Sequence, residues 1–340
     1  MMSLLLQHNG MSRIEMCRIS GLSAQTISVI VRGLERDGMI LRGEAQRGRV
    51  GPPTIPMYLN PEGAFSVGAD VGPHSVDVVL IDFAGAVRHK TTADLRSARV
   101  DEVAAALDGL IPEALAQLDA GQTQRLAGIG LTLPSDFDHW PGELAPGIAD
   151  FEQHLNRMTG QQTFIQDQVT AAAGAVGMFE QPPVHGDYLF CLIGPEVSNR
   201  LILDHHVYAG VEAGERAIEA GLTGLDRRLL ETGSTRVIWR RDEDWPEFGA
   251  ALDDWIEVCS DNLIRTLISL RQFVSVDQLI VAGHAPETIC TRICATAQRK
   301  LEAARPGAGL GIRQSGLGTW VSAIGAARLP FHSRFMVQGE

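Results

Sequence analysis

The residues best suited to contact another molecule lie on a short polar stripe near the N-terminus. Gln25, Ser28 and Arg32 recur at helical spacing, so they share one face if this segment is a helix. Amide and hydroxyl side chains can hydrogen-bond base edges in a DNA major groove, and arginine can reach phosphate. The predicted contacts to double-stranded DNA are Ser23, Ala24, Gln25, Thr26, Ser28, Arg32, Arg47 and Arg49.

Two helices joined by a tight turn are predicted to position this stripe. Ser12 and Ser23 are candidate N-caps, and Gly21 between the helices supplies the turn. Gly38 is placed to end the second helix as a left-handed residue. The buried face of that helix is predicted from the spacing i, i+3, i+4, i+7 of Ile27, Ile30, Val31 and Leu34. Two short helices around a glycine turn are typical of a helix-turn-helix.

A β-hairpin is predicted directly after these helices. Strand-like runs at 39–42 and 54–59 flank a Gly- and Pro-containing loop that carries Arg47 and Arg49. Pro56 lacks an N–H, which predicts that its strand lies at a sheet edge. The whole pattern indicates a winged helix-turn-helix; the alternative is a small helical cap with a solvated polar face.

Charge is distributed unevenly along the chain. The 340 residues carry a net charge of −12. The first 58 hold seven arginines against four acids, a net of +3, which leaves −15 for the remainder. An acidic body repels nucleic acid, whereas a basic N-terminal segment can hold phosphate.

Composition excludes several other classes of protein. Apolar residues at 45% and charged residues at 21% are ordinary for a globular chain. No apolar run approaches the ~18 residues of a membrane span, and the N-terminus lacks the features of a secretory signal. An odd number of cysteines, five, fits a reduced protein better than a disulfide scaffold. We therefore expect a cytoplasmic protein with no membrane partner.

The sequence offers weak candidates for a metal site. Cys290 and Cys294 are spaced i, i+4 on a predicted helix, but no further residue has ligand spacing, so buried thiols are expected. His205 and His206 are adjacent in a predicted strand and are expected to point to opposite faces. No metal is predicted.

One pattern of elements occurs twice after a turn at 60–63. Three short strands, a helix, a strand and a helix are predicted from residue 65 onward, and again from residue 187. The repeat indicates an internal duplication with a cleft between the halves. The predicted domains are 1–60, 61–185 and 186–340.

Motifs along nearly the whole chain resemble the ROK family of repressors and sugar kinases. They include GLSAQTISVIVRGLERDGMI, GRVGPPTIPMYLNPEGAFSVGADVG, GIGLTLP, TAAAGA and SAIGAARLP. The resemblance implies an α/β protein with an N-terminal winged helix-turn-helix and a two-lobed actin-like (ribonuclease H-like) ATPase fold. It also implies a transcriptional regulator that binds a DNA operator as a homodimer or dimer of dimers and senses a sugar or sugar derivative.

The motifs that perform catalysis in the family's kinases are altered here. The kinase motif D-x-G-G-T corresponds to Asp70-Val71-Gly72-Pro73, whose proline lacks an N–H for phosphate, and Glu196 lies in the second phosphate turn. Aligning the motif N-D-A-N-A-A-A on its alanines gives Gln168 the position of the base, whereas a shift of one residue gives it to Asp167. The resemblance thus implies a degenerate kinase domain with no catalytic residue and no cofactor.

The family's sugar-binding motifs are also largely lost. The motif G-E-x-G-H corresponds to residues 216–220 without its ligands, and the zinc motif is absent. Ser135, Asp136, Asp167 and Gln168 fall where the family holds sugar hydroxyls, so they are the predicted ligand contacts. Two alternatives stay open: an active ATP-dependent sugar kinase with a DNA-binding head, and a body that no longer binds any sugar.

Overall fold

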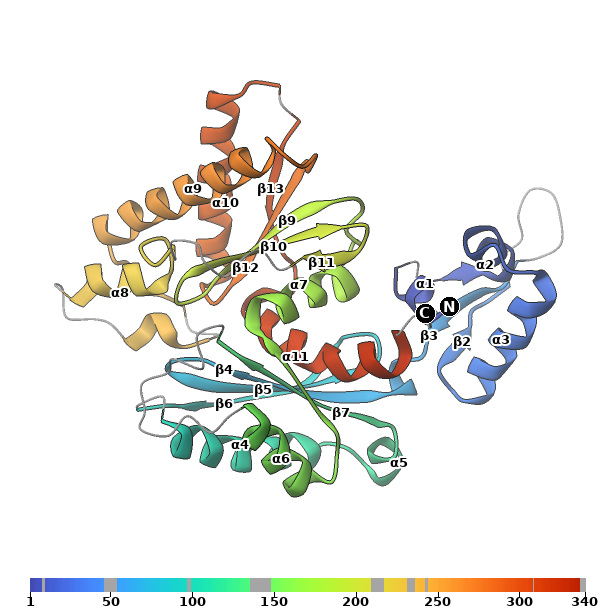
Figure 1. The fold of residues 1–340 in the computed structure, drawn as a ribbon. Coiled ribbons are helices and arrows are strands. Elements are labelled where there is room, and N and C mark those ends of the chain that lie inside the picture. The colour runs from blue at the N-terminus through green and yellow to red at the C-terminus, as the bar shows by residue number, and fades with distance from the viewer. Residues whose placement is uncertain are drawn as a thin grey trace.

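The computed structural model contains two large sheets and a separate N-terminal unit (Figure 1). It describes the residues 1–7, 10–45, 54–96, 99–134, 148–208, 217–230, 236–241, 244–307 and 309–336. Within these residues, no helix is both long and apolar enough to cross a membrane.

The N-terminal unit, residues 1–59, consists of three short helices and a three-stranded sheet. Its elements are α1 (Met2–Gln7), β1 (Met11–Ser12), α2 (Arg13–Ser20), α3 (Ala24–Arg36), β2 (Ile40–Arg42) and β3 (Pro56–Leu59). Ser12 caps α2 and forms a capping box with Glu15, and Ser23 caps α3. Gly38 adopts the predicted left-handed conformation with φ of 72°, and Gly21 at the predicted turn is also left-handed, with φ of 69°.

The prediction that Pro56 lies in an edge strand is wrong. The strand order is β1-β3-β2, so β3 is central. Pro56 is the first residue of β3, pairs with Ser12, and accepts a hydrogen bond from the Gly43 N–H at 2.8 Å. Only the proline carbonyl is used at this position, which is why a central strand tolerates the missing N–H.

The first large sheet has the strand order β6-β5-β4-β7-β8. Its strands are β4 (Phe65–Val71), β5 (Ser75–Asp82), β6 (Val87–Asp94), β7 (Leu126–Leu133) and β8 (Thr163–Asp167), and the 3-10 turn η1 (Pro61–Gly63) precedes them. The helices that follow its strands are α4 (Val100–Leu115), α5 (Ala120–Thr123), α6 (Ile148–Thr159) and α7 (Gln168–Phe179). Helix α4 packs against β4, β5 and β6, and α6 packs against β8, so both cover the lower face in Figure 1.

The second large sheet repeats this topology in the order β11-β10-β9-β12-β13. Its strands are β9 (Tyr188–Ile193), β10 (Val197–Leu203), β11 (His206–Tyr208), β12 (Gln278–Gly283) and β13 (Gly311–Gln314). The helices in this part of the chain are α8 (Leu222–Leu230), α9 (Ala250–Leu270), α10 (Glu287–Ala304) and α11 (Val321–Phe331), with short turns η3 (Arg236–Trp239), η4 (Gly318–Trp320) and η5 (His332–Met336). In each sheet three antiparallel strands precede two parallel ones, which confirms the predicted repeat of elements.

The two adjacent histidines do not share a strand, contrary to the prediction. Asp204 and His205 have φ of 48° and 64° and form the turn between β10 and β11, so only His206 belongs to a strand. A two-residue turn with positive φ at both positions is the hairpin connection that matches strand twist.

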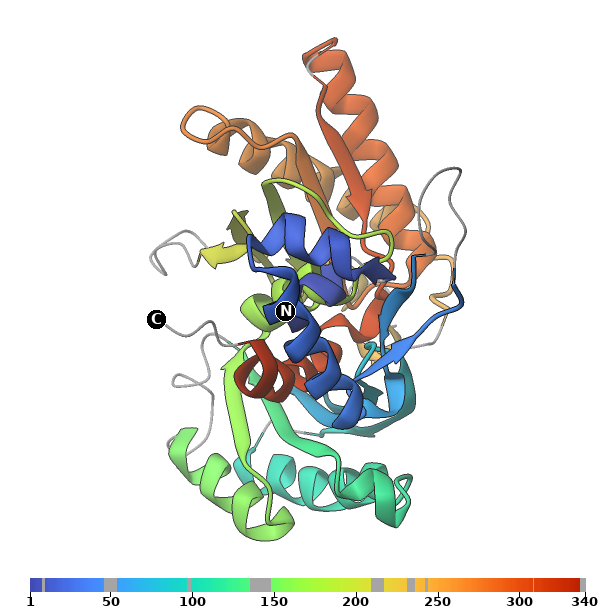
Figure 2. The same cartoon turned by 90° about the vertical axis from the view of Figure 1, so that its right-hand side faces the viewer.

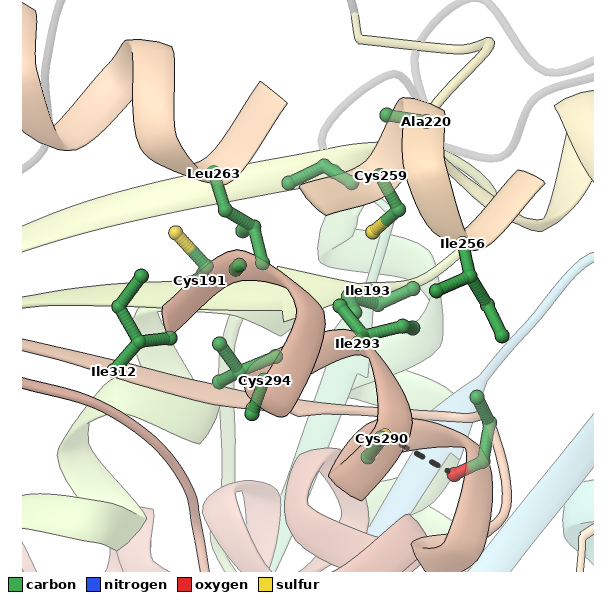
Figure 3. Close-up of a cluster of buried hydrophobic side chains, with 14 of the residues drawn as sticks. Cys191, Ile193, Ala220, Ile256, Cys259, Leu263, Cys290, Ile293, Cys294 and Ile312 are labelled. Carbon is green, nitrogen blue, oxygen red and sulfur yellow. Dashed lines mark hydrogen bonds between the residues drawn. The ribbon is translucent and has the colours of Figure 1, made fainter. Parts of the chain in front are cut away.

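Four cysteines lie in the core between the second sheet and its helices (Figure 3). Cys191 belongs to β9, Cys259 to α9, and Cys290 and Cys294 to α10; each is at most 6% exposed. Apolar side chains such as Ile293 and Leu263 surround them (Figure 3). The expectation that Cys290 and Cys294 are buried thiols is confirmed.

Helices α7 and α11 pack together between the two sheets (Figure 1). Although α11 lies in the segment 186–340, it packs on the first sheet, directly over β4 and β7. Gly68 of β4 and Gly130 of β7 permit this approach: a Cβ on Gly130 would lie 1.8 Å from the carbonyl oxygen of Ala326.

The N-terminal unit is joined to the body through a continuous core. Met16, Ile27 and Met57 belong to the same buried cluster as Phe83, which directly follows β5, and Phe331 of α11. Figure 2 shows the unit in front of both sheets. The buried face of α3 is therefore part of a core that the N-terminal unit shares with the body.

The segment Asn60–Gly63 adds polar contacts to that junction. The Asn60 side-chain amide donates to the Gly38 carbonyl at 2.6 Å, next to the end of α3. On the other side, Arg125 donates to the Gly63 carbonyl at 3.2 Å, and the Phe83 N–H donates to the Pro61 carbonyl at 3.1 Å. The segment predicted as a turn is thus hydrogen-bonded to both parts of the chain.

Candidate functional site

The outer face of α3 carries the polar stripe predicted from the sequence. Gln25, Thr26 and Arg32 are exposed, whereas Ser28 is half-buried. Val29, between them, is 58% exposed and adds an apolar contact surface. The opposite face of the helix is buried through Ile27 and Val31. The body thus leaves the polar stripe accessible.

Local hydrogen bonds fix the geometry of this stripe. The Ser23 hydroxyl accepts from the Thr26 N–H at 3.1 Å and shares a 2.8 Å hydrogen bond with the Thr26 hydroxyl. Arg32 donates from Nε to the Ser28 carbonyl at 3.0 Å, and this bond uses only one of the three guanidinium nitrogens. Ser23, Ala24 and Thr26 lie at the helix N-terminus, where backbone N–H groups and the helix dipole favour an anion such as phosphate.

Charges beside the stripe are partly neutralised. Glu35 accepts from Arg42 at 2.7 Å and lies 3.8 Å from Arg13, and hydrogen bonding from Arg42 lowers the pKa of Glu35. Arg18 is exposed on α2. Arg47 and Arg49, the predicted contacts on the hairpin loop, lie outside the described residues.

A second candidate site is a cavity of about 190 Å³ between the two large sheets. Its walls come from the end of β8, the start of α7, the β9–β10 turn and α8. They are formed by Pro134, Asp167, Gln168, Val169, Leu192, Gly194, Pro195, Glu196, Ser198, Ile218, Thr223 and Arg227. The structure brings Asp167 and Gln168 together here; Ser135 and Asp136 lie outside the described residues.

Asp167 is the last residue of β8 and the N-cap of α7. Its Oδ1 accepts from the Thr170 N–H at 2.8 Å and from Arg200 Nη2 at 2.9 Å. Arg200 comes from β10 and also donates to the Thr170 hydroxyl at 2.7 Å. The carboxylate is therefore held by a helix N-terminus and by an arginine from the other sheet.

Gln168 faces a buried acid as well as the cavity. Its amide donates to Asp70 Oδ1 at 2.7 Å and to the Val71 carbonyl at 3.0 Å. Only 8% of Gln168 is exposed. An amide in this position acts as a hydrogen-bond donor and cannot take up a proton near neutral pH.

Asp70 is the centre of a network that sequence reasoning did not find. Besides Gln168, it accepts from the Thr132 hydroxyl at 2.8 Å and from Arg241 Nη2 at 2.6 Å. Arg241 donates from Nε to Asp77 as well and lies 3.1 Å from His284 Nε2. The sequence carried a signal for this network, because Asp70 and Asp77 lie within the apolar runs FSVGADVG and SVDVVLID. Two buried acids side by side require a cation.

The electrostatics of this network follow from its burial. Burial raises the pKa of Asp70, while Arg241 opposes that shift. Burial lowers the pKa of Arg241, but the carboxylates of Asp77 and Asp70 outweigh it and the pKa is raised overall. Burial, together with Arg241, holds the pKa of His284 well below its usual value. The arginine is thus charged and His284 is neutral, so its Nε2 can accept a hydrogen bond from Arg241.

The residues that correspond to the second phosphate turn and to the sugar-binding motif lie partly in the cavity wall and partly outside it. Glu196 lines the cavity, whereas Glu219 forms an ion pair with Arg227. Ile218 supplies an apolar wall. Across the described parts of the chain, no three His, Cys, Asp or Glu side chains are grouped so that they could hold a metal ion.

Comparison with known sequences identifies relatives at low identity. The chain is 25% identical over 358 residues to the uncharacterized protein y4fQ of Sinorhizobium fredii (strain NBRC 101917 / NGR234), with 98% of this chain and 90% of that protein covered. It is 23% identical over 216 residues to the xylose repressor of Bacillus subtilis (strain 168), with 61% and 55% covered. The xylose repressor of Bacillus spizizenii matches at 21% over 286 residues, with 79% and 73% covered. No family model matches the chain.

Comparison with solved structures defines the fold. A ROK family transcriptional regulator, a homolog of the E. coli MLC protein, superposes with a TM-score of 0.65 at 18% identity, covering 97% of this chain and 94% of that one. A ROK family glucokinase from Streptomyces griseus superposes with a TM-score of 0.54 at 15% identity, covering 78% and 99%. The predicted resemblance to the ROK family is confirmed, and the chain has the fold of the ROK proteins.

Proposed function

We propose that this protein is a ROK-type transcriptional regulator whose N-terminal unit is a winged helix-turn-helix. The observation that carries the proposal is the stripe of Gln25, Ser28 and Arg32 on α3, which lies on the face turned away from the packed core. The regulator described above is similar to 97% of this chain, whereas the glucokinase match extends over 78%. An additional unit before a kinase-like body supports the same assignment.

Recognition of a DNA operator would use the outer face of α3. Gln25 is suited to paired hydrogen bonds with adenine, and Val29 to contact with a thymine methyl group. Ser23, Ala24 and Thr26 at the helix N-terminus, with Arg32, Arg47 and Arg49, would hold phosphates. A homodimer, or a dimer of dimers, would space two such helices about 34–36 Å apart or at multiples of that distance.

The body, in this proposal, binds a sugar or sugar derivative in the cavity without phosphorylating it. Asp167 and Gln168 supply carboxylate and amide groups suited to hydroxyls, and Ser135 and Asp136 come directly after Pro134, a residue of the cavity wall, in the sequence. Three features argue against phosphoryl transfer. Asp70 is already paired with Arg241. Pro73, which has no N–H to offer a phosphate, follows Gly72 in the first phosphate turn. Glu196 puts negative charge at the cavity wall beside Gly194, in the second phosphate turn.

Mobility-shift assays with the DNA flanking the protein's own gene test the regulator. We expect sequence-selective retention that weakens steeply as salt rises, because phosphate contacts release counterions. A thermal-shift screen of sugars and polyols tests the body, since a ligand that binds only the folded state raises the Tm. Retention that ignores DNA sequence at every salt concentration contradicts the first part, and a full screen without a shift contradicts the second.

A second candidate function is an ATP-dependent sugar kinase that carries a DNA-binding head. Asp167 favours it, because this carboxylate lines the cavity and would serve as the base if the motif is shifted by one residue. ADP release over a panel of hexoses, amino sugars and polyols separates the two. The regulator predicts no turnover; sustained turnover that disappears in Asp167→Ala establishes the kinase.

A further inference from the structure

Three consecutive residues, Trp239 at the end of η3 and the two that follow it, reach from the second sheet to the first. Their backbone is anchored in the second half of the chain, because Ile238 of η3 is fully buried in the core of α8, α9 and the second sheet. From there, the Trp239 ring packs against His74 in a tilted arrangement, with ring centroids 4.5 Å apart and an interplanar angle of 51°, and Arg240 lies 3.4 Å from Asp94. Both partners belong to the β4–β5–β6 end of the first sheet.

Arg241 makes the deepest of these contacts. Its side chain is 4% exposed, and it donates to two carboxylates of the first sheet, Asp70 and Asp77, neither of which has any exposed side-chain surface. The Asp77 carboxylate has further donors in the hydroxyls of Ser75 and Thr92, at 3.0 and 2.7 Å. A single guanidinium therefore serves as the cation for both buried acids.

The same guanidinium also contacts groups on the other side of the boundary between the sheets. Its Nη1 donates to the carbonyl of Thr319 in η4, just before α11. Its Nη2 lies 3.1 Å from His284 Nε2, and His284 is fixed by its own N–H to the Ile193 carbonyl of β9 at 2.9 Å. Arg241 is thus bound on both sides of the boundary between the sheets.

Losing this contact is costly. If the sheets separated with Arg241 retained by the second half, the facing carboxylates of Asp70 and Asp77 would lose the cation that they share. Removing one partner of a buried ion pair is strongly unfavourable because it leaves an uncompensated charge. Packed interfaces switch between discrete arrangements and do not deform continuously.

We propose that Trp239–Arg241 is a latch that holds the two halves of the body closed, with Arg241 as its ionic centre. The inference concerns the body alone and does not rest on DNA binding. Gln168 connects the latch to the cavity, because its amide lines the cavity and donates to the same carboxylate, Asp70, as Arg241 does.

The test compares two double variants in the full-length chain. R241Q/D77N removes the ion pair between Arg241 and Asp77. Because one acid and one base are replaced together, the net charge of the chain does not change. R88Q/D82N is the matched control, because Arg88 also pairs with a buried carboxylate, at 2.7 Å, but both residues belong to the first sheet. Amide hydrogen exchange of residues 236–241 and the radius of gyration from solution scattering are measured for each.

We expect R241Q/D77N to exchange at least about tenfold faster than the wild type at residues 236–241 and to have a larger radius of gyration, with R88Q/D82N unchanged in both. Wild-type exchange and scattering in R241Q/D77N would overturn the proposal. If R241Q/D77N does not fold, chemical rescue decides: added methylguanidinium should raise the Tm of R241A and not that of R88A. An equal response of the two single variants overturns the latch.

Discussion

Asp70 and Asp77 are paired directly across strands β4 and β5, and both carboxylates are completely buried. Like charges directly opposite in a sheet are destabilising unless a cation lies between them. Arg241 supplies that cation from a segment 164 residues further along the chain than Asp77. This relationship links the stability of the first sheet to the closed arrangement of the body.

The pairing also bears on catalysis. In the kinase motif D-x-G-G-T the strand aspartate leads into the phosphate turn, and here that aspartate, Asp70, is occupied by the chain's own guanidinium. The Asp70 carboxylate is thus bound by an arginine and by two neutral donors, Thr132 and Gln168. This arrangement supports the proposal that the body does not transfer phosphate.

The neutral state of His284 predicts an acid-sensitive stability. Burial holds its pKa well below 6.5 in the folded chain, whereas the unfolded chain binds a proton near 6.5. The unfolded state therefore binds more protons below pH 6.5, so the free energy of unfolding falls as the pH falls from 6.5 toward the folded pKa. Urea unfolding of wild type and H284Q between pH 7 and 5 should show a shallower loss in H284Q, whose amide oxygen can still accept from Arg241.

A matched histidine separates this effect from general acid denaturation. His332 is more exposed, and burial lowers its pKa less strongly. H332Q should therefore change the pH dependence less than H284Q does. Parallel pH profiles for wild type and H284Q would show that His284 is not held neutral.

The close packing of α11 on the first sheet predicts a large effect of one methyl group. A Cβ at position 130 would lie 1.8 Å from a backbone oxygen of α11, so Gly130→Ala must displace the helix. Overpacking of this kind should lower the free energy of unfolding by at least about 2 kcal/mol. Urea unfolding followed by circular dichroism measures the change.

Gly109→Ala is the control for that substitution. Gly109 lies inside α4 with no atom within 4 Å of the added Cβ, and it is exposed. Because alanine favours a helix interior, this variant should gain about 0.5–1 kcal/mol. If the two variants are equally stable, α11 does not pack on β7 as described.

The fold was more predictable than its polar interior. The caps at Ser12 and Ser23 and the turn at Gly21 are local signals, and each predicted an observed element. The repeat of three strands, helix, strand and helix was also readable, because hydrophobic periodicity marks each element separately. The Pro56 error arose because β1, a strand of two residues, carries too little pattern to be recognised.

Contacts between distant segments could not be predicted in the same way. Arg241 lies in the run WRRDED, where a charged side chain is ordinarily solvated, and only the tertiary fold brings it to Asp70. Asp167 and Gln168 were both predicted ligand contacts and both line the cavity, but their different partners, Arg200 and Asp70, depend on packing between the two sheets. Ser135 and Asp136 stay predictions.

The buried cysteines predict a low reactivity of the native thiols. Burial raises the pKa of Cys290 and of Cys294 to about 12 from a usual value of 9.0. Three pKa units reduce the thiolate fraction at pH 8 about a thousandfold, and burial blocks access as well. In the native protein a disulfide reagent should modify Cys17 on α2 quickly and the other four thiols slowly.

The variant Cys17→Ser checks that assignment. It should show no fast phase in the native state and four reactive thiols after denaturation. A fast phase that persists in native Cys17→Ser shows that the core of the second sheet opens readily.

Fluorescence anisotropy of a labelled operator duplex, selected from the DNA beside the protein's gene, measures DNA recognition by α3. The chains compared are wild type, Gln25→Ala, Arg32→Ala and Arg292→Ala. Arg292 of α10 is the control, because it is an exposed arginine in the second half of the body, paired with Asp253 of α9 at 2.6 Å.

We expect Gln25→Ala to lose about tenfold or more in affinity for the operator and to discriminate less against scrambled DNA. Arg32→Ala should weaken binding to both duplexes with a shallower salt dependence, and Arg292→Ala should match wild type. Wild-type affinity in both α3 variants would contradict the account.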